Sequence, residues 1–303
     1  MEEKVSIILV NYNGKSYNEK CIYSILQSTV KDKLQIVVVD NASTDESLTD
    51  LKLKWGRNSQ VCIIELDQNY GFSKANNEGI NWSVEHGIGN FLLLNNDTEI
   101  EPDAIEKMLE IQKTTGGIVV PKVLYADKPD TIWCAGGGFT PIIRKPRQRG
   151  LNQIDKGQFS QNCECEFANG CCLLLSKEII DKIGMLDERF FLYYEDTEYS
   201  LRAQENGVTI SYCAEAVIYH KVNGSTKGNE KPENAYYISR NWLLCNKMHL
   251  GKRFYLFFLY YLLNRIVWIA IWGMRGKPNM VLAVLDGIYA FKAGKYGKWE
   301  TVR

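Results

Sequence analysis

The stretch "LQIVVVDNASTDES" (34–47) places a run of apolar residues directly before a turn rich in Asp, Asn and Ser. A continuous apolar run of this length is typical of a strand buried on both faces of a parallel sheet. Three further stretches repeat the arrangement: "VSIILVNYNG" (5–14), "VCIIELDQNYGF" (61–72) and "NFLLLNNDTEIEP" (90–102). Helical periodicity follows each one, and we expect Ser43 or Thr44 to cap the second helix. The sequence therefore predicts an α/β fold with a Rossmann-like, mostly parallel sheet and helices on both faces.

The four strand ends share amide and carboxylate side chains. In open α/β sheets, ligands bind at the carboxyl ends of the strands. These ends lack G-x-G-x-x-G and the Walker lysine, so a dinucleotide site or a P-loop is weakly supported. Their oxygen-rich side chains suit a ribonucleoside and a divalent cation, Mg²⁺ or Mn²⁺. Any one such turn could be an ordinary turn, but four of them on one edge indicate a ligand site.

Composition and charge narrow the class of protein. Of the 303 residues, 45% are apolar, enough for a sizeable globular core. The 36 Lys and Arg residues balance the 36 Asp and Glu residues, so the net charge indicates no nucleic-acid partner. No secretory signal precedes the first strand, and we expect a cytoplasmic protein with reduced cysteines. The cluster of Cys163, Cys165, Cys171 and Cys172 lacks the C-x₂-C pairing of zinc sites.

The second half of the chain is less regular. Strands are predicted in "GGIVVPKVLY", "TIWCAGGGF", "NGCCLLLS" and "VTISYCAEAVIYH". Residues 140–167 have little periodicity and predict a long mobile loop, which is either a cover for the site or a solvated insertion. A loop with four aromatic residues then precedes a helix that we expect to begin at about Thr197.

Six motifs occur in order between Val5 and Asn241: "SIILVNYNG", "VVVDNASTDES", "NYGFSKANNEG", "LLLNNDTEIEP", "IGMLDERFFLYYEDTEYSLRAQENG" and "IYHKVNGST". Together they resemble the family 2 glycosyltransferases, in particular the bacterial branch of rhamnosyl- and galactofuranosyltransferases of surface polysaccharides. The resemblance implies a GT-A domain over residues 1–247, with a nucleotide-binding half to about 120 and an acceptor half after it. It also implies inverting, metal-dependent transfer from a nucleoside-diphosphate sugar, dTDP-rhamnose or a UDP-sugar, to a polysaccharide or polyprenyl-linked glycan.

The resemblance also assigns residues to the nucleotide sugar. These are Asn11, Tyr12, Asn13, Asp40, Asn41, Asp45, Gly71, Phe72, Asn76, Asn77, Asn95 and Asn96. Gly71 is expected to let the backbone approach the ligand closely, and Asn76 and Asn77 are expected to offer amides from the first turn of a helix.

The metal motif of the family, D-x-D, appears here as Asn95-Asn96-Asp97. Asp97 matches the metal-binding Asp, whereas Asn95 replaces a carboxylate with a neutral amide. His220 matches a His that ligates the metal in several relatives. A lone His is more often structural, but its place in the motif favours a metal ligand.

The carboxylate pair Glu195 and Asp196 matches the position of the general base. Inverting transfer needs one carboxylate to accept the proton of the attacking hydroxyl. Two neighbouring carboxylates repel each other, which would raise the pKa of one of them. Asp196 is the preferred base and Glu195 is retained as a candidate. The alternative is a solvated pair in which Asp196 only caps a helix.

The segment "FYLFFLYYLLNRIVWIAIWGM" (254–274) is long enough to span a membrane, but Asn264 and Arg265 at its centre are costly there. Tyr, Trp and Arg recur on one side, and basic residues flank both ends. We predict that residues 248–303 form amphipathic helices and a basic tail on the inner face of the cell membrane. A spanning helix, a buried helix and the oligomeric state stay open. A non-catalytic scaffold in a polysaccharide assembly complex is the alternative function, and the neutral Asn95 favours it.

Overall fold

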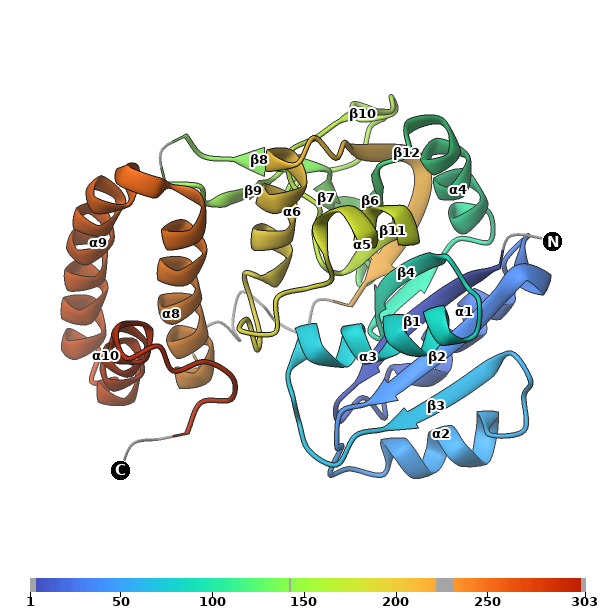
Figure 1. Cartoon of the computed structure of the whole chain (residues 1–303), viewed down its shortest axis with the longest axis horizontal. Helices are drawn as coiled ribbons and strands as arrows, with labels where there is room; N and C mark the ends of the chain where they lie inside the picture. The colour runs from blue at the N-terminus through green and yellow to red at the C-terminus, as the bar shows by residue number, and fades with distance from the viewer. Residues whose placement is uncertain (1–3, 142, 222–230, 301–303) are drawn as a thin grey trace.

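A computed structural model of the chain describes residues 4–141, 143–221 and 231–300 (Figure 1). Residues 222–226 of the "IYHKVNGST" motif lie outside the described residues. The strands are β1 (Val5–Asn11), β2 (Leu34–Asp40), β3 (Val61–Glu65), β4 (Asn90–Asn95), β5 (Thr98–Ile100), β6 (Ile118–Tyr125), β7 (Lys128–Ala135), β8 (Gly137–Phe139), β9 (Pro146–Gln148), β10 (Cys163–Glu164), β11 (Cys172–Ser176) and β12 (Ile210–His220). The helices are α1 (Asn18–Leu26), α2 (Ser47–Trp55), α3 (Phe72–Glu85), α4 (Ala104–Thr115), α5 (Lys177–Ile183), α6 (Glu195–Glu205), α8 (Pro232–His249), α9 (Phe254–Met274) and α10 (Pro278–Lys292), with short 3₁₀ turns η1 (Lys31–Lys33) and η2 (Gly251–Arg253).

The central sheet confirms the predicted parallel core. Its main path runs β10-β12-β6-β11-β4-β1-β2-β3. Strands β1 to β4 are parallel, and their register sets Asn11 beside Asp40 and Val10 beside Asn95. Strand β11 enters antiparallel between β4 and β6, whereas β12 lies parallel to β6. The four predicted strand ends therefore meet at one edge of the sheet.

Helices cover both faces of this sheet, as predicted. On one face, Val5, Ile7 and Leu9 pack with residues of α1, α2 and α4. On the other face, Ile8 and Val39 pack with residues of α3, α5 and α6. Each fully buried Ile or Leu contributes on the order of 1.5–3 kcal/mol, so this two-sided core holds the strand ends in fixed positions.

Two local predictions are wrong. Helix α2 begins at Ser47, and neither Ser43 nor Thr44 caps it. The reason is that the main-chain N–H groups of Ser43 and Thr44 donate to Asp40 and Asn13, which holds both residues in the preceding turn. The expected long loop 140–167 contains β9, which pairs with β8, and β10, which pairs with β12. An ion pair of 2.9 Å between Lys122 and Asp155 also fixes this segment to β6.

The last three helices form an extension beside the α/β domain, drawn in orange and red in Figure 1. Helix α10 packs along α8, and α9 places Phe257 and Tyr261 against Trp242 of α8. Only 22% of the most apolar window of Gly251–Met274 is buried, although this helix is long and apolar enough to cross a membrane. The outward side of α9 is apolar and exposed: Tyr255, Leu256, Leu259, Leu263, Ile266, Val267 and Met274.

Candidate active site

A cavity of about 800 Å³ opens at the carboxyl edge of the parallel strands. We call it the strand-edge cavity. Seven of the predicted ligand residues line it: Tyr12, Asn41, Gly71, Phe72, Asn95, Asn96 and Asp97. The facing wall comes from the C-terminal extension and from the loop before α6 that contains Phe190, Phe191, Tyr193 and Tyr194, which we call the aromatic loop. This wall includes Phe191, Lys231, Tyr237 and Trp299. The cavity is therefore built by residues that are far apart in the sequence.

Asn11 and Asp40 form the support beneath this edge and do not line the cavity. The Asn11 side chain is fully buried, and its amide donates to Asp40 Oδ1 at 2.6 Å and to Ser47 Oγ at 2.9 Å. Asp40 Oδ2 accepts from the main-chain N–H of Ser43 at 3.1 Å. Both side chains thus fix the turns after β1 and β2.

Asn13 and Asp45 join the same two turns from the outside. Asn13 has a left-handed backbone (φ 55°), and its Oδ1 accepts from the N–H groups of Thr44 and Asp45 at 2.8 and 3.2 Å. Asp45 Oδ1 in turn accepts from the N–H of Ser47 at 3.0 Å. Neither residue lines the strand-edge cavity.

The turn after β3 holds the aromatic loop against the sheet. The side chain of Asn41 bonds to this turn three times: it accepts from the N–H of Tyr70 at 2.9 Å and donates to Asn69 Oδ1 at 3.0 Å and to the carbonyl of Gly71 at 3.2 Å. Gly71 has φ 88°, and a Cβ there would clash with the carbonyl oxygen of Phe191. That carbonyl accepts from the N–H of Phe72 at 2.7 Å. Gly71 was expected to let the backbone approach a ligand closely. In the structure it also lets the backbone approach Phe191 closely.

Asn76 and Asn77 are buried and do not reach the cavity. Asn76 Nδ2 donates to the carbonyl of Phe72 at 2.9 Å. Asn77 Nδ2 donates to the carbonyl of Leu186 at 2.9 Å, and its Oδ1 accepts from the N–H of Leu186 at 3.1 Å. The Asn77 amide therefore anchors the chain that leads into the aromatic loop, whereas the Asn76 amide bonds within α3.

Asp97 lines the strand-edge cavity and contacts His220, which does not line it. The pairing of β5 with β12 sets His220 opposite Thr98, and His220 Nε2 lies 3.1 Å from Asp97 Oδ1. This contact is short enough for a hydrogen bond but lacks the orientation of one, so Asp97 Oδ1 is buried without a hydrogen-bond partner among the described residues. Ligands of Mg²⁺ lie at about 2.1 Å in octahedral geometry, which puts neighbouring ligands about 3 Å apart. The pair therefore fits two donors of one divalent cation.

No third His, Cys, Asp or Glu of the described residues joins this pair. Such a two-donor site is what a cation needs when phosphate oxygens of a bound substrate supply further ligands. Asn95 lines the cavity beside Asp97.

The aromatic loop enters α6 through two strained residues. Tyr193 and Tyr194 have φ of 66° and 73°, which is uncommon for residues with a Cβ. Asn241, fully buried in α8, donates to the carbonyls of Leu192 and Tyr193 at 2.9 and 2.7 Å. This contact holds the loop so that Glu195 and Asp196 occupy the first turn of α6.

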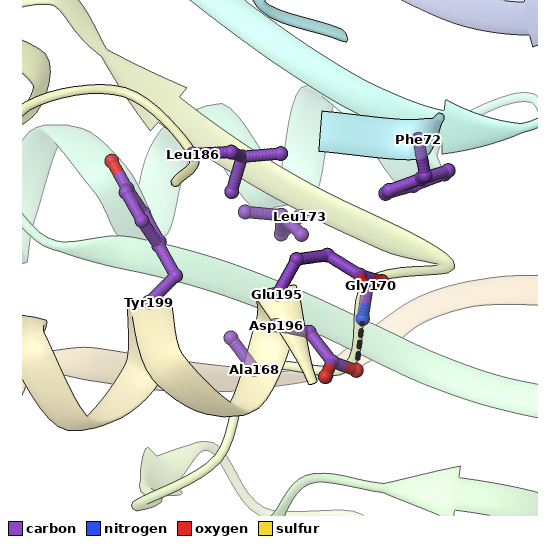
Figure 2. Close-up of a pocket in the computed structure, with 8 residues that line it drawn as sticks. All are labelled: Phe72, Ala168, Gly170, Leu173, Leu186, Glu195, Asp196 and Tyr199. Carbon is purple, nitrogen blue, oxygen red and sulfur yellow. Dashed lines mark hydrogen bonds between the residues drawn. The ribbon is translucent and has the colours of Figure 1, made fainter. Parts of the chain in front are cut away.

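Figure 2 shows that the two carboxylates point in different directions. Glu195 extends into a small apolar pocket near Phe72, and its Oε2 is buried with no hydrogen-bond partner among the described residues. Asp196 Oδ2 accepts from the N–H of Gly170 at 3.2 Å, and Oδ1 accepts from the N–H of Thr197 at 2.6 Å. Burial raises the pKa of both groups, and the charge of Asp196 adds to the rise at Glu195.

Asp196 also lines a second and larger cavity of about 1140 Å³, which we call the helix-side cavity. Segment 140–151 forms one wall, and α8 and α9 form another. Glu195 lines neither this cavity nor the strand-edge cavity. Of the pair, only Asp196 can therefore meet a substrate in either large cavity.

The comparisons with known proteins agree with this arrangement. Residues 6–184 match the family model described as glycosyl transferase family 2. The chain belongs to glycosyl transferase family 2. This family 2 member is accordingly a glycosyltransferase, and the family implies a nucleotide-sugar donor and a glycan acceptor.

Two relatives resemble this glycosyltransferase over most of its length. It is 28% identical over 254 residues to the low-salt glycan biosynthesis hexosyltransferase Agl10 of Haloferax volcanii, covering 83% of this chain and 78% of that protein. It is 26% identical over 309 residues to the dTDP-rhamnosyl transferase RfbF of Shigella flexneri, covering 97% and 98% of the two chains.

Solved structures confirm the GT-A fold of the glycosyltransferase. GalNAc-T7 with UDP, GalNAc and Mn²⁺ aligns with a TM-score of 0.59 at 15% identity, over 78% of this chain and 48% of that one. Residues 1–349 of TarS of S. aureus align with a TM-score of 0.55 at 15% identity, over 96% and 73%.

Several residues of the glycosyltransferase site were not predicted. The tail was expected at the membrane, yet Trp299 lines the strand-edge cavity with its Nε1 buried and unpartnered among the described residues. Its ring stacks on Tyr236 with 4.9 Å between centroids. Asn241 was also missed, although "SRN" (239–241) is a polar run inside an apolar helix and is the available signal.

Proposed function

We propose that this glycosyltransferase moves a sugar, with inversion, from a nucleoside diphosphate in the strand-edge cavity to a hydroxyl in the helix-side cavity. The observation that carries the proposal is the separation of the two chemical roles. Asp97 and His220 lie in or beside one cavity, and Asp196 lines the other. The small pocket of Figure 2 lies between them, since it shares Phe72 with the first cavity and Asp196 with the second.

Asp196 is the proposed general base. Its two oxygens accept from the N–H of Gly170 and from the N–H and hydroxyl of Thr197, so one of their four lone pairs remains for the acceptor hydroxyl. Burial raises the pKa of Asp196, which increases its affinity for a proton relative to a solvated Asp. Glu195 stays in its apolar pocket and supports the start of α6.

Asp97 and His220 would hold Mg²⁺ or Mn²⁺, whose charge neutralises the leaving diphosphate. The neutral Asn95 leaves one fewer carboxylate at this place, which lowers repulsion toward the diphosphate of the donor. Tyr12, Asn41 and Trp299 surround the remaining space for the nucleoside and sugar. The donor is dTDP-rhamnose or a UDP-sugar, and the relative named as a dTDP-rhamnosyl transferase supports the former.

We further propose that the enzyme lies on the inner face of the cell membrane through α9. The inward side of α9 packs on α8 with Phe257 and Tyr261 buried, so this helix cannot be surrounded by lipid while that packing holds. Its outward apolar side is exposed, and Lys252 and Arg253 flank it at the N-terminal end. A one-sided apolar face next to cations suits binding to an anionic membrane surface.

A thermal-shift screen of nucleoside-diphosphate sugars, with Mn²⁺ and with EDTA, tests the proposal. We expect one donor to raise the melting temperature in Mn²⁺ and little or no shift in EDTA. The bound donor should then be consumed when a lipid extract of the source cells is added as acceptor. Metal-dependent binding without consumption would instead support the non-catalytic scaffold, and no binding of any donor would refute both functions.

A further inference from the structure

Arg265 sits at the centre of the apolar helix α9, yet it points into the protein. Its side chain is 8% exposed and lines the helix-side cavity. The guanidinium stacks over Trp242 at 5.4 Å and Tyr261 at 5.1 Å. Its Nε has no hydrogen-bond partner, and no carboxylate forms an ion pair with it, among the described residues. A buried cation without an anion is costly, so this arrangement calls for an anionic partner.

The charge of the helix-side cavity points the same way. Besides Arg275, which already interacts with another residue, three cationic side chains line it: Lys145, Arg147 and Arg265. Asp196 is the only acidic residue among its described lining residues. Lys145 and Arg147 lie on the segment around β9, across the cavity from α9. A neutral glycan would leave this positive charge unbalanced, whereas a phosphate group would balance it and accept charge-assisted hydrogen bonds.

We propose that Arg265, with Lys145 and Arg147, binds a phosphate group of the acceptor and thereby presents the acceptor hydroxyl to Asp196. This inference rests on the proposed function, because it assigns the helix-side cavity to the acceptor. The aromatic faces of Trp242 and Tyr261 fix the plane of the guanidinium, so little freedom is lost when it bonds to phosphate. The phosphate belongs either to a lipid carrier or to the glycan itself.

Calorimetry on the full-length protein tests the site without any sugar transfer. The probes are farnesyl diphosphate and inorganic pyrophosphate, each in EDTA so that no divalent cation recruits them to Asp97. Arg265→Gln should weaken binding of farnesyl diphosphate about 10- to 100-fold, the usual effect of losing a charged hydrogen-bond donor. Arg57→Gln, an exposed arginine just after α2 that lines neither large cavity, is the control and should stay within about 2-fold.

Two further arms keep the test decisive. Arg147 is exposed, so Arg147→Gln should fold normally and should also weaken binding even if Arg265→Gln does not fold. Farnesyl diphosphate binding much more tightly than pyrophosphate indicates a lipid-linked phosphate, and equal affinities indicate a phosphate within the glycan. Unchanged binding in both Arg265→Gln and Arg147→Gln, or no binding by the wild type, overturns the inference. Donor binding in Mn²⁺ is measured on the same samples, so a failure here is distinguished from a failure of the proposed function.

Discussion

Replacing Asp196 by Asn should abolish most of the catalytic rate while leaving the donor site intact. Asn keeps an oxygen that can accept from the N–H of Thr197, now 2.6 Å from Oδ1. Its amide group cannot accept from the N–H of Gly170, now 3.2 Å from Oδ2. We therefore expect a stability loss of about 1 kcal/mol, the usual value for one hydrogen bond.

The kinetic effect should be much larger than this structural effect. Loss of a general base typically costs about 10²–10⁴ in rate, which corresponds to about 2.7–5.4 kcal/mol of activation free energy. We expect kcat to fall by at least about two decades and the Kd of the donor to change by less than about 3-fold, since Asp196 does not line the strand-edge cavity. The assay follows release of the nucleoside diphosphate at saturating donor, and calorimetry gives the donor Kd.

Glu195→Gln is the matched control. Glu195 lies in the apolar pocket of Figure 2 and lines neither large cavity, so its amide variant should retain most of the wild-type kcat. If kcat falls further in Glu195→Gln than in Asp196→Asn, Glu195 is the general base and Asp196 is not. If both variants transfer sugar at nearly the wild-type rate, neither carboxylate is the base and the reasoning fails.

Three further predictions concern stability and membrane binding. Burial raises the folded-state pKa of Glu195 from 4.5 to about 8. Between these values the native chain holds a proton that the unfolded chain has lost, so the free energy of unfolding should fall as the pH rises from 4.5 to about 8. Burial raises the pKa of Asp196 as well, so Glu195→Gln should show a smaller fall than the wild type, and parallel pH curves in thermal melts would contradict this. Gly71 and Gly87 both have a positive φ, of 88° and 72°, but only at Gly71 would an added Cβ clash with a neighbour. In urea unfolding, Gly71→Ala should therefore lose at least about 1 kcal/mol more free energy of unfolding than the control Gly87→Ala. Leu259→Asp on the exposed side of α9 should reduce co-sedimentation with anionic liposomes several-fold, whereas Leu53→Asp, on the exposed side of α2, should not. Equal sedimentation of the two variants would refute the membrane face.

The strand ends were predictable because the signal is local. A buried parallel strand must be apolar throughout, and the polar residue that ends it is visible in the sequence. The resulting edge holds Asn41, Asn95 and Asp97 as expected. What the pattern could not give is the direction of each side chain. Asn11 and Asn77 carry the same amide as Asn41, but their partners lie elsewhere in the chain, at Asp40 and Leu186.

In the C-terminal extension, too, the sequence predicts the helix but not the neighbours of its side chains. The helical period of residues 254–274 predicts a helix and its two sides, and α9 has these bounds. Which side faces the protein depends on Trp242 of α8, which the sequence of α9 does not contain. The costly Arg265 at the centre of the apolar segment was the one local sign that this side is not exposed to lipid.

We propose that Asp97 binds a divalent cation that the donor diphosphate needs. The direct test is calorimetric titration of the wild type and of Asp97→Asn with the donor found in the thermal-shift screen, each with Mn²⁺ and with EDTA. We predict that Mn²⁺ tightens donor binding to the wild type at least about 10-fold, and that Asp97→Asn removes most of this gain because the carboxylate 3.1 Å from His220 is lost. An Asp97→Asn protein that binds the donor with the same Mn²⁺ dependence as the wild type would contradict the account.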